Sequence, residues 1–391
     1  MTGATMLPTD REELRAHLLG AVDAISGTLA DCADQAEREG RYPERGWRAL
    51  HDAGLFRVKS PRELGGAEAD PVTQIEVIER LAYIDTTAAW TQFVGAGTLS
   101  IVAAWLPDAG LEQYLVDGRL PRTAGGVAAS GEAVPVEGGY RLTGRWPFAS
   151  GCYHAEWLSG TSYIAGADPV AVLGFAFPRE AVTIHDTWDV SSLKGTGSAD
   201  ISVQDLFVPT EHTFDNFAPA ARGGPLYAIT LPGFVANEHG AFALGAARRA
   251  VDEVVALAKT KTRGYVIPQG VAGREKFQWD LGRTEVALRS ARAGLVAVNE
   301  EAWQAASSGA GVGVALQTEL RGTAVHATEV ALDAVRTMFR YAGAKSLYTG
   351  NIIDRCLRDV TAASQHGIVN DVSYELHGQA VLGLQDIAPL S

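Results

Sequence analysis

Hydrophobic residues recur at helical spacing over the first third of the chain. Leu14, Leu18 and Val22 follow one another at intervals of four residues, which places their side chains on one face of a helix. The glycine-rich stretch over residues 60–71 has the composition of a loop between helices. The pattern therefore predicts an N-terminal helical domain over residues 1–120.

Short alternating segments separated by glycine and proline replace this pattern from residue 121 to about residue 215. Alternation of apolar and polar residues is typical of strands with one buried face. The pair Gly138–Gly139, with Val136 before it and Tyr140 after it, is a hairpin signal. We therefore expect a β domain over residues 121–215.

The chain becomes helical again after residue 222. A long alanine-rich helix is predicted from Phe234 to Lys261, and further helices are predicted over 274–307, 314–342 and 351–386. Glycine and alanine dominate these segments and allow helices to approach closely, as in a four-helix bundle. The bundle would occupy residues 216–391, so the fold class is α+β in the order α, β, α.

Composition narrows the possible functions. The 391 residues carry 33 Lys+Arg against 46 Asp+Glu, a net charge of -13, with no basic patch, which argues against nucleic-acid and membrane-surface partners. No apolar run reaches the ~18 residues of a membrane span. The three cysteines form no CxxC pair, so we expect neither a zinc site nor disulfides. Reduced thiols and an N-terminus unlike a signal peptide lead us to expect a cytoplasmic protein.

The first candidate motif is LTGRWPFASG, residues 142–151. Trp146 and Phe148 offer flat apolar surface, while Ser150 and Gly151 offer a hydroxyl and an unshielded backbone N–H. Together they could bind a flat heterocycle with a polar edge. The alternative is a strand with aromatic core residues that ends in a glycine turn.

The second candidate motif is SLKGTGSAD, residues 192–200. Thr196, Gly197 and Ser198 make a loop rich in hydroxyls and backbone N–H groups, which can hold a phosphate or an anionic ring edge. It lacks the GKT or GKS of a Walker sequence and the third glycine of GxGxxG. The alternative is an ordinary connection between two strands.

The third candidate is the segment RDVTAASQHG, residues 358–367. We expect Arg358 and Asp359 to form ion pairs on a helix, and we expect His366 near the helix end, where the helix dipole favours a protonated ring. A lone histidine is usually structural. Nucleophilic catalysis has no support, because GxSxG is missing and no cysteine has the context of a catalytic thiol.

These three motifs in an α–β–α chain resemble the acyl-CoA dehydrogenase fold family, over nearly the whole sequence. Within it, GRWPFASG and LKGTGSADISVQDLFVP are similar to the flavin-dependent monooxygenases that receive reduced flavin from a separate reductase. The resemblance implies a homotetramer, with the flavin between the β domain and the bundle and with a neighbouring subunit completing the site.

The resemblance also assigns residues to the cofactor. The residues that would contact the isoalloxazine ring are Trp146, Phe148, Ser150 and Gly151. The residues that would meet the polar edge or the phosphate side are Thr196, Gly197 and Ser198. Arg263 and Gln278 would contact the flavin tail. No motif distinguishes FAD from FMN.

The C-terminal motif separates two branches of the family. Many acyl-CoA dehydrogenases carry a catalytic glutamate shortly after an Arg-Asp pair, whereas this chain has Gln365-His366-Gly367 there. Glu238 is the nearest candidate for a base on an earlier helix. The resemblance places Trp90, Thr98 and Glu238 at the substrate, and Thr98 stands where several monooxygenases have a histidine.

The implied activity is monooxygenation of a small molecule. Reduced FAD or FMN would react with O2 to form a C4a-hydroperoxyflavin, sheltered from water by an apolar pocket. Ser150 would hydrogen-bond the flavin N5 or the peroxide, and His366 would act as general base or proton relay. We expect an aromatic, indole-type or amine substrate of secondary metabolism and no metal. The alternatives are an acyl-CoA dehydrogenase or oxidase with bound FAD, and a helical scaffold that has lost flavin binding.

Overall fold

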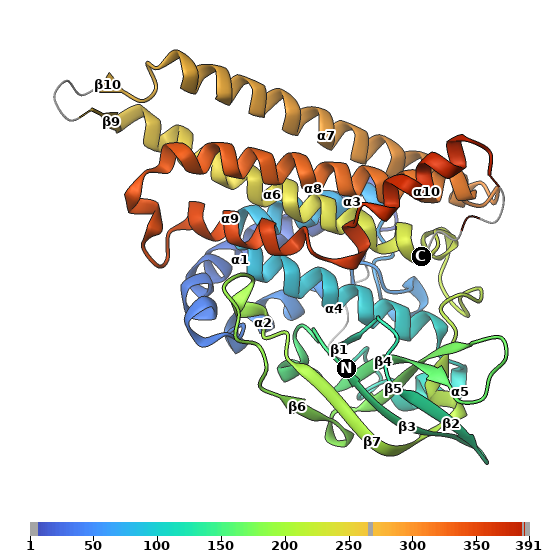
Figure 1. Ribbon diagram of the computed structural model, residues 1–391. Coiled ribbons are helices and arrows are strands. Elements are labelled where there is room, and N and C mark those ends of the chain that lie inside the picture. The colour runs from blue at the N-terminus through green and yellow to red at the C-terminus, as the bar shows by residue number, and fades with distance from the viewer. Residues whose placement is uncertain (1–6, 265–268, 385–386, 388–391) are drawn as a thin grey trace. The chain divides into compact units, whose positions relative to one another are not determined.

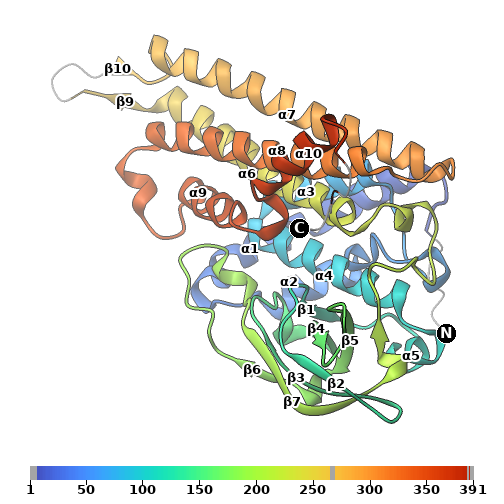
Figure 2. The same cartoon turned by 45° about the vertical axis from the view of Figure 1, so that its right-hand side comes forward.

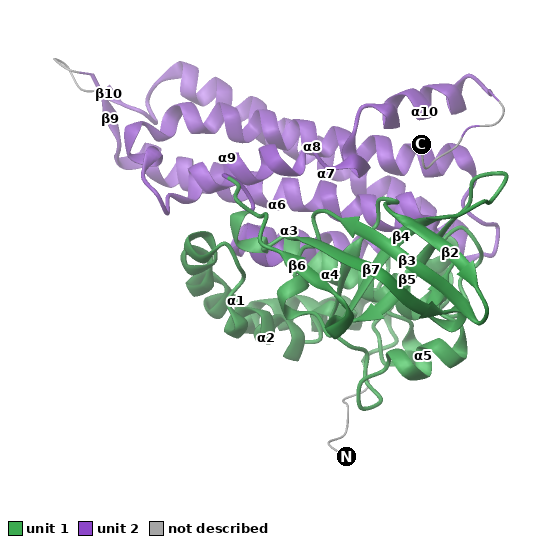
Figure 3. Ribbon diagram, turned by 60° about the horizontal axis from the view of Figure 1, so that its bottom comes forward, with its two compact units in different colours: residues 1–70, 90–190, 194–228 green, residues 71–89, 191–193, 229–391 purple. Residues whose placement is uncertain are grey.

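The computed structural model describes residues 7–264, 269–384 and 387. The chain divides into two compact units, which Figure 3 shows in green and purple. Unit 1 comprises residues 1–70, 90–190 and 194–228. Unit 2 comprises residues 71–89, 191–193 and 229–391.

Helices of the N-terminal third begin and end where local chemistry requires. The side chain of Asp10 accepts hydrogen bonds from the backbone N–H groups of Glu12 and Glu13, and Gly40 ends the first helix in the left-handed conformation. Leu14 on this helix is buried as predicted. The helices of this part are α1 (Arg11–Glu39), α2 (Glu44–Asp52), α3 (Pro71–Ile84), α4 (Thr86–Trp105) and α5 (Asp108–Tyr114).

Unit 1 contains an eight-stranded sheet with strand order β6-β7-β3-β2-β4-β5-β8, and β1 pairs with β4. The predicted hairpin is confirmed: β2 and β3 pair antiparallel, with Val136 opposite Gly139, and Gly138 takes a positive φ of 78°. Figure 2 shows these strands. Their bounds are β1 (Thr123–Gly126), β2 (Glu132–Val136), β3 (Gly139–Trp146), β4 (Trp157–Ile164), β5 (Val172–Pro178), β6 (Thr183–His185), β7 (Asp200–Pro209) and β8 (Thr213–Phe214).

Unit 2 is a helical bundle in which α8 packs against α6 and α7, and α6 also packs against α3. Figure 1 shows α6, α7 and α8 running side by side. The bounds of its remaining elements are α6 (Leu231–Thr260), β9 (Thr262–Arg263), β10 (Gln269–Gly270), α7 (Glu275–Ser307), α8 (Val314–Ala342), α9 (Ile352–Ala363) and α10 (Val372–Val381).

Small residues set the spacing of the bundle, as the sequence predicted. A methyl group on Gly245 of α6 would lie 2.4 Å from the carbonyl oxygen of Glu79 on α3. A methyl group on Gly240 would lie 3.1 Å from Leu295 on α7. The α6 backbone therefore touches α3 at a place where only glycine fits.

One predicted helix is divided. The helix predicted over residues 351–386 is found as α9 and α10 with a 3-10 turn at Gly367–Val369 between them, and residues 385–386 of that prediction lie outside the described residues. Glycine and asparagine are poor helix formers, and Gly367 and Asn370 both lie in this break. Among the described residues, no helix combines the length and the apolar character that crossing a bilayer requires.

Candidate active site

Two loops that are about 45 residues apart in the sequence meet in unit 1. The first follows β3 and contains Phe148, Ser150 and Gly151; the second precedes β7 and contains Thr196 and Ser198. The N–H of Gly151 donates to the carbonyl of Thr196 at 3.2 Å, which joins the two loops through their backbones. The structure therefore brings together two motifs that the sequence could only identify separately.

A chain of three hydroxyls links the loops through their side chains. The Ser150 and Ser198 hydroxyl oxygens are 2.6 Å apart, and those of Thr196 and Ser198 are 2.7 Å apart. All three side chains are buried. A hydroxyl both donates and accepts hydrogen bonds, so this chain orients the three side chains toward one another.

The two aromatic residues of the first loop have opposite environments. Phe148 is 68% exposed, takes a positive φ of 62°, and meets Trp188 edge-on with ring centroids 6.1 Å apart. Trp146 is 0% exposed and its indole N–H donates to the Thr161 carbonyl at 2.8 Å. Phe148 therefore presents a flat ring to solvent. Trp146 does not, which corrects that expectation, because it ends the buried face of β3 and faces the core of the sheet.

Trp90 and Thr98 both lie on α4 and are buried. The Thr98 hydroxyl donates to the Val94 carbonyl of its own helix at 3.0 Å, and the Trp90 ring meets Phe93 edge-on. The hydroxyl of Thr98 is thus engaged within the helix. Their assignment to the substrate stays a prediction.

A crevice opens in unit 1 beside the first loop, with about 500 Å³ of space that includes its open mouth. Thr91, Gly95 and Leu99 line it from one face of α4, and Trp47 and Phe56 form an aromatic wall. The Trp47 and Phe56 rings are stacked at 4.8 Å. Sequence reasoning missed this crevice, because the only signal in α4 is a four-residue spacing that many buried helices share.

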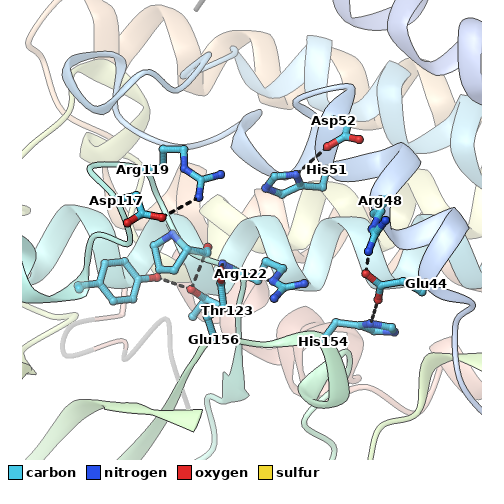
Figure 4. A network of polar contacts seen from close by, with 12 residues as sticks. Glu44, Arg48, His51, Asp52, Asp117, Arg119, Arg122, Thr123, His154 and Glu156 are labelled. Atoms are coloured by element: carbon cyan, nitrogen blue, oxygen red, sulfur yellow. Dashed lines mark hydrogen bonds and ion pairs between the residues drawn. The ribbon is translucent and has the colours of Figure 1, made fainter. Parts of the chain in front are cut away.

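Polar groups around the crevice form the network drawn in Figure 4. Nδ1 of His154 lies 3.0 Å from Glu44, and its Nε2 lies 2.9 Å from the Tyr42 carbonyl. Burial acts to raise the pKa of Glu44, but His154 and Arg48 outweigh it and hold that pKa below its usual value. A carbonyl and a carboxylate only accept hydrogen bonds, so both ring nitrogens of His154 face acceptors.

In unit 2, His366 lies against a second histidine. The ring centroids of His239 on α6 and His366 are 4.3 Å apart, with an angle of 41° between the planes. Nδ1 of His239 donates to the Val235 carbonyl at 3.0 Å, so its Nε2 carries a lone pair in the neutral ring. Nδ1 of His366 accepts from the backbone N–H of Ile368 at 3.2 Å, so its proton lies on Nε2.

The environment of His366 differs from the expected one. α9 ends at Ala363, and His366 instead caps the following 3-10 turn with its own Nδ1. Solvent reaches part of the His366 ring. The neighbouring protein atoms nevertheless desolvate the ring, and this desolvation lowers the pKa of His366 to about 4. The expectation of a protonated ring was wrong, because a nitrogen that accepts a backbone N–H cannot hold a proton.

Arg358 forms an ion pair on its own helix, as expected, whereas Asp359 is buried. Arg358 pairs with Asp354 at 2.7 Å, while Asp359 is buried and accepts from the Thr86 hydroxyl and the Leu193 N–H, both at 2.6 Å. Burial raises the pKa of Asp359. Asp359 thereby holds Leu193 to the bundle, immediately before the loop that contains Thr196.

Glu238, Arg263 and Gln278 occupy separate parts of unit 2. Glu238 and its neighbour His239 are buried on α6. The guanidinium of Arg263 donates to the Arg340 carbonyl, and Gln278 donates to the Ala272 carbonyl at 3.0 Å. Arg263 follows the C-terminal end of α6, roughly 30 Å along the helix from His239 at 1.5 Å per residue.

Comparisons with known proteins agree with this architecture. The N-terminal domain of acyl-CoA dehydrogenases matches residues 11–116, and the C-terminal domain matches residues 238–371. The indole-3-acetate monooxygenase of Pseudomonas putida is 30% identical over 337 residues, 85% of each chain. The flavin-dependent monooxygenase oxygenase subunit HsaA of Rhodococcus jostii is 28% identical and covers 93% of this chain and 97% of that protein.

The chain belongs to the flavin-dependent monooxygenases of the acyl-CoA dehydrogenase fold. The structure of XiaF from a Streptomyces species, in complex with FADH2 and glycerol, superposes with a TM-score of 0.89 at 27% identity and covers 97% of this chain and 98% of that one. The predicted α+β fold and the monooxygenase class are confirmed, and the acyl-CoA dehydrogenase alternative is not favoured.

Proposed function

We propose that this flavin-dependent monooxygenase is the oxygenase component of a two-component system that hydroxylates an aromatic small molecule. Two relatives are named as an indole-3-acetate monooxygenase and an oxygenase subunit, which supports an aromatic substrate and a separate flavin reductase as partner. The observation that carries the proposal is His366, which stands where acyl-CoA dehydrogenases of this fold carry a carboxylate. A neutral imidazole suits proton transfer during hydroxylation and is a poor substitute for that carboxylate.

The loops of unit 1 fit the flavin. Phe148 offers an exposed flat ring on which an isoalloxazine can pack, and the three linked hydroxyls of Ser150, Thr196 and Ser198 lie in the loops that would meet its polar edge. Gly151 and Gly197 both take positive φ values, 78° and 57°, so the backbone can approach a ring closely. Reduced flavin, when bound, would supply the two electrons that activate O2, and one oxygen atom of that O2 would be transferred to the substrate.

The two histidines of unit 2 are suited to different roles, one as acceptor and one as donor. His239 has its lone pair on Nε2 and can accept the proton of an acidic substrate, whereas His366 has its proton on Nε2 and can donate a hydrogen bond to a developing oxyanion. The sequence suggested His366 as the base. The hydrogen bonds of the two rings favour His239 for that role and His366 for the donor role.

Arg263 and Gln278 fit a role in a neighbouring copy. Arg263 lies just beyond the C-terminal end of α6, roughly 30 Å along the helix from His239, and Gln278 lies in the first turn of α7; there they would serve the flavin of another subunit in a homotetramer. Sedimentation measurements test this: a tetramer that Arg263→Ala leaves intact while flavin affinity falls would support it, and a monomer would contradict it.

The central experiment supplies photochemically reduced FMN or FAD to the purified chain in air. We expect O2 consumption coupled to hydroxylation of an aromatic probe such as indole. His366→Ala should lower hydroxylation at least tenfold while flavin affinity is kept, because positioned proton transfer contributes ~10²–10⁴ in rate. Bleaching of bound flavin by an acyl-CoA, with no coupled O2 chemistry, would instead show a dehydrogenase.

A further inference from the structure

Three residues of the connection between β6 and β7 belong to unit 2, although both strands lie in unit 1. Residues 191–193 group with the helical bundle, whereas the chain before residue 191 and the loop from Lys194 onward belong to unit 1. The last of the three, Leu193, leads directly into the loop that contains Thr196 and Ser198. Whatever fixes residues 191–193 therefore fixes the point from which this loop starts.

Two consecutive residues of α9 hold this three-residue segment. The guanidinium of Arg358 donates to the carbonyl of Ser191, and one carboxylate oxygen of Asp359 accepts from the backbone N–H of Leu193 at 2.6 Å. The other carboxylate oxygen of Asp359 accepts from the Thr86 hydroxyl, also at 2.6 Å. Thr86, Leu193 and Asp359 are all buried, so water does not readily replace these bonds when one partner is removed.

The backbone of Leu193 depends on such contacts. Its φ is 48°, in the left-handed region that disfavours residues with a side chain beyond glycine. A residue in that region keeps its conformation only where the surrounding structure determines it. Without the carboxylate that accepts its N–H, Leu193 would lose one of the contacts that hold it there, and the backbone after it would change direction.

The contacts between the two flavin loops follow closely after Leu193 in the sequence. Three residues later, the carbonyl of Thr196 accepts from the N–H of Gly151 at 3.2 Å. Five residues later, the hydroxyl oxygen of Ser198 lies 2.6 Å from that of Ser150. Over so short a length of chain, a change in backbone direction at Leu193 would disturb both contacts.

We propose that Asp359 is a positioning residue for reduced flavin, which sets the conformation of the loop at Thr196 and Ser198 by holding the backbone of Leu193. The inference rests on the proposed function, which assigns this loop to the flavin. Asp359 itself touches neither the cofactor nor the substrate and acts through Leu193. On this reading the Arg-Asp pair serves the cofactor loop, while His366, seven residues further along the chain, serves proton transfer.

Substitutions at one site separate the two hydrogen bonds of the carboxylate. Asp359→Ala removes both acceptors. Asp359→Asn keeps one oxygen for the Leu193 N–H, while its amide donates to the Thr86 hydroxyl, which can also accept. Thr86→Val is the matched control, because it removes the other hydrogen bond of the same carboxylate and leaves the bond to Leu193 in place.

Hydrogen exchange over residues 192–199 of the flavin-free chain, measured by mass spectrometry, reports on the loop itself. Exchange there should quicken at least about tenfold in Asp359→Ala and stay within about twofold of the unaltered chain in Asp359→Asn and Thr86→Val. Anaerobic titration with reduced FMN and FAD should show flavin affinity falling at least about fivefold in Asp359→Ala, and within about twofold of the unaltered chain in the other two variants.

Arg358→Met provides a milder test of the same segment, should Asp359→Ala fail to fold. It removes the donor to the Ser191 carbonyl, and its side chain is less buried than that of Asp359. Exchange over residues 192–199 should quicken about threefold and flavin affinity should fall about twofold. Exchange and affinity that both stay at the values of the unaltered chain would overturn the proposal.

Ser198→Ala distinguishes failure of this inference from failure of the proposed function. Lower flavin affinity in Ser198→Ala with unchanged affinity in Asp359→Ala would overturn the positioning role and keep the flavin at the loop. Unchanged affinity in both variants would contradict the assignment of the loop to the flavin, and the inference with it. Equal effects of Asp359→Ala and Thr86→Val on loop exchange would also overturn the inference, because they would show a general loss of stability.

Discussion

Trp146 and Phe148 are two residues apart, yet the structure predicts opposite consequences for replacing them. Trp146→Phe removes the indole N–H that donates to the Thr161 carbonyl. That carbonyl still accepts from the Ser130 N–H at 2.9 Å, so the loss is that of one ordinary hydrogen bond, about 0.5–1.5 kcal/mol. The smaller ring also leaves a void in the sheet core, which adds about 1–2 kcal/mol. We expect unfolding free energy to fall by about 2–3 kcal/mol.

Phe148→Gly should have the reverse effects. Phe148 is 68% exposed and loses little by truncation, while its positive φ of 62° is a conformation that glycine adopts without strain. Relief of that strain stabilises the fold by about 1 kcal/mol. Two destabilising effects offset it: the edge contact with Trp188 is lost, and glycine has greater conformational freedom in the unfolded chain. Stability should therefore stay within about 1 kcal/mol of the unaltered chain, whereas affinity for reduced flavin should fall at least fivefold.

Urea unfolding followed by circular dichroism gives the stability changes, and anaerobic titration with reduced FMN and FAD gives the affinities. Circular dichroism is preferred because Trp146→Phe alters the tryptophan fluorescence itself. The reasoning would be refuted if Trp146→Phe kept its stability and lost flavin affinity. It would be refuted equally if Phe148→Gly lost more than about 2 kcal/mol, since that would show Phe148 to be a packing residue.

Three other predictions follow from the bundle. Gly245→Ala should destabilise the fold by about 1–3 kcal/mol, because the new methyl group meets the Glu79 backbone. Gly282→Ala, on an exposed part of α7 with open space around it, should stabilise the fold by about 0.5–1 kcal/mol. Melting temperatures of the two variants test this difference. The ring of His366, with a pKa near 4 instead of 6.5, should stay neutral down to about pH 5, so histidine NMR titration should show no protonation at pH 6. Burial raises the pKa of Asp85 to about 7, so the folded state favours the protonated carboxyl. The contribution of this protonated carboxyl to the free energy of unfolding is therefore lost as the pH rises from about 4 through 7. Asp85→Asn should flatten the pH dependence of urea unfolding over that interval, and an unchanged slope would show that the folded protein does not raise this pKa.

Much of the fold could be predicted from periodicity and turn chemistry. Every predicted helix before residue 342 exists, and the Gly138 hairpin has the expected register, because these features depend on residues close in sequence. The division of the last helix was missed. Gly367 and Asn370 weaken that helix only modestly, and the side chain of His366 then stabilises the break, a contact that composition does not reveal.

The two loop motifs of the candidate site were predicted from the sequence, but the contact between them was not. The motifs at Ser150 and Ser198 each suggested hydroxyls for a ligand, but only the pairing of β3 with β7 brings the two together. Trp146 and Phe148 look alike in sequence as flat apolar residues. The alternation of β3 decides between them: it carries Trp146 into the core, and the positive φ after the strand turns Phe148 out.

The roles of the histidines show most clearly what a fold adds to a motif. His366 was predicted to be catalytic because of its place after an Arg-Asp pair, and His239 was given no catalytic role. Which nitrogen holds the proton depends on the nearest backbone group: a carbonyl, that of Val235, fixes it on Nδ1 of His239, and an N–H, that of Ile368, excludes it from Nδ1 of His366. The backbone thus makes one ring an acceptor and its neighbour a donor at the same atom, Nε2. A substitution of His239 or His366 that keeps the shape of the ring but changes which nitrogen carries the proton should therefore abolish proton transfer while the fold is retained.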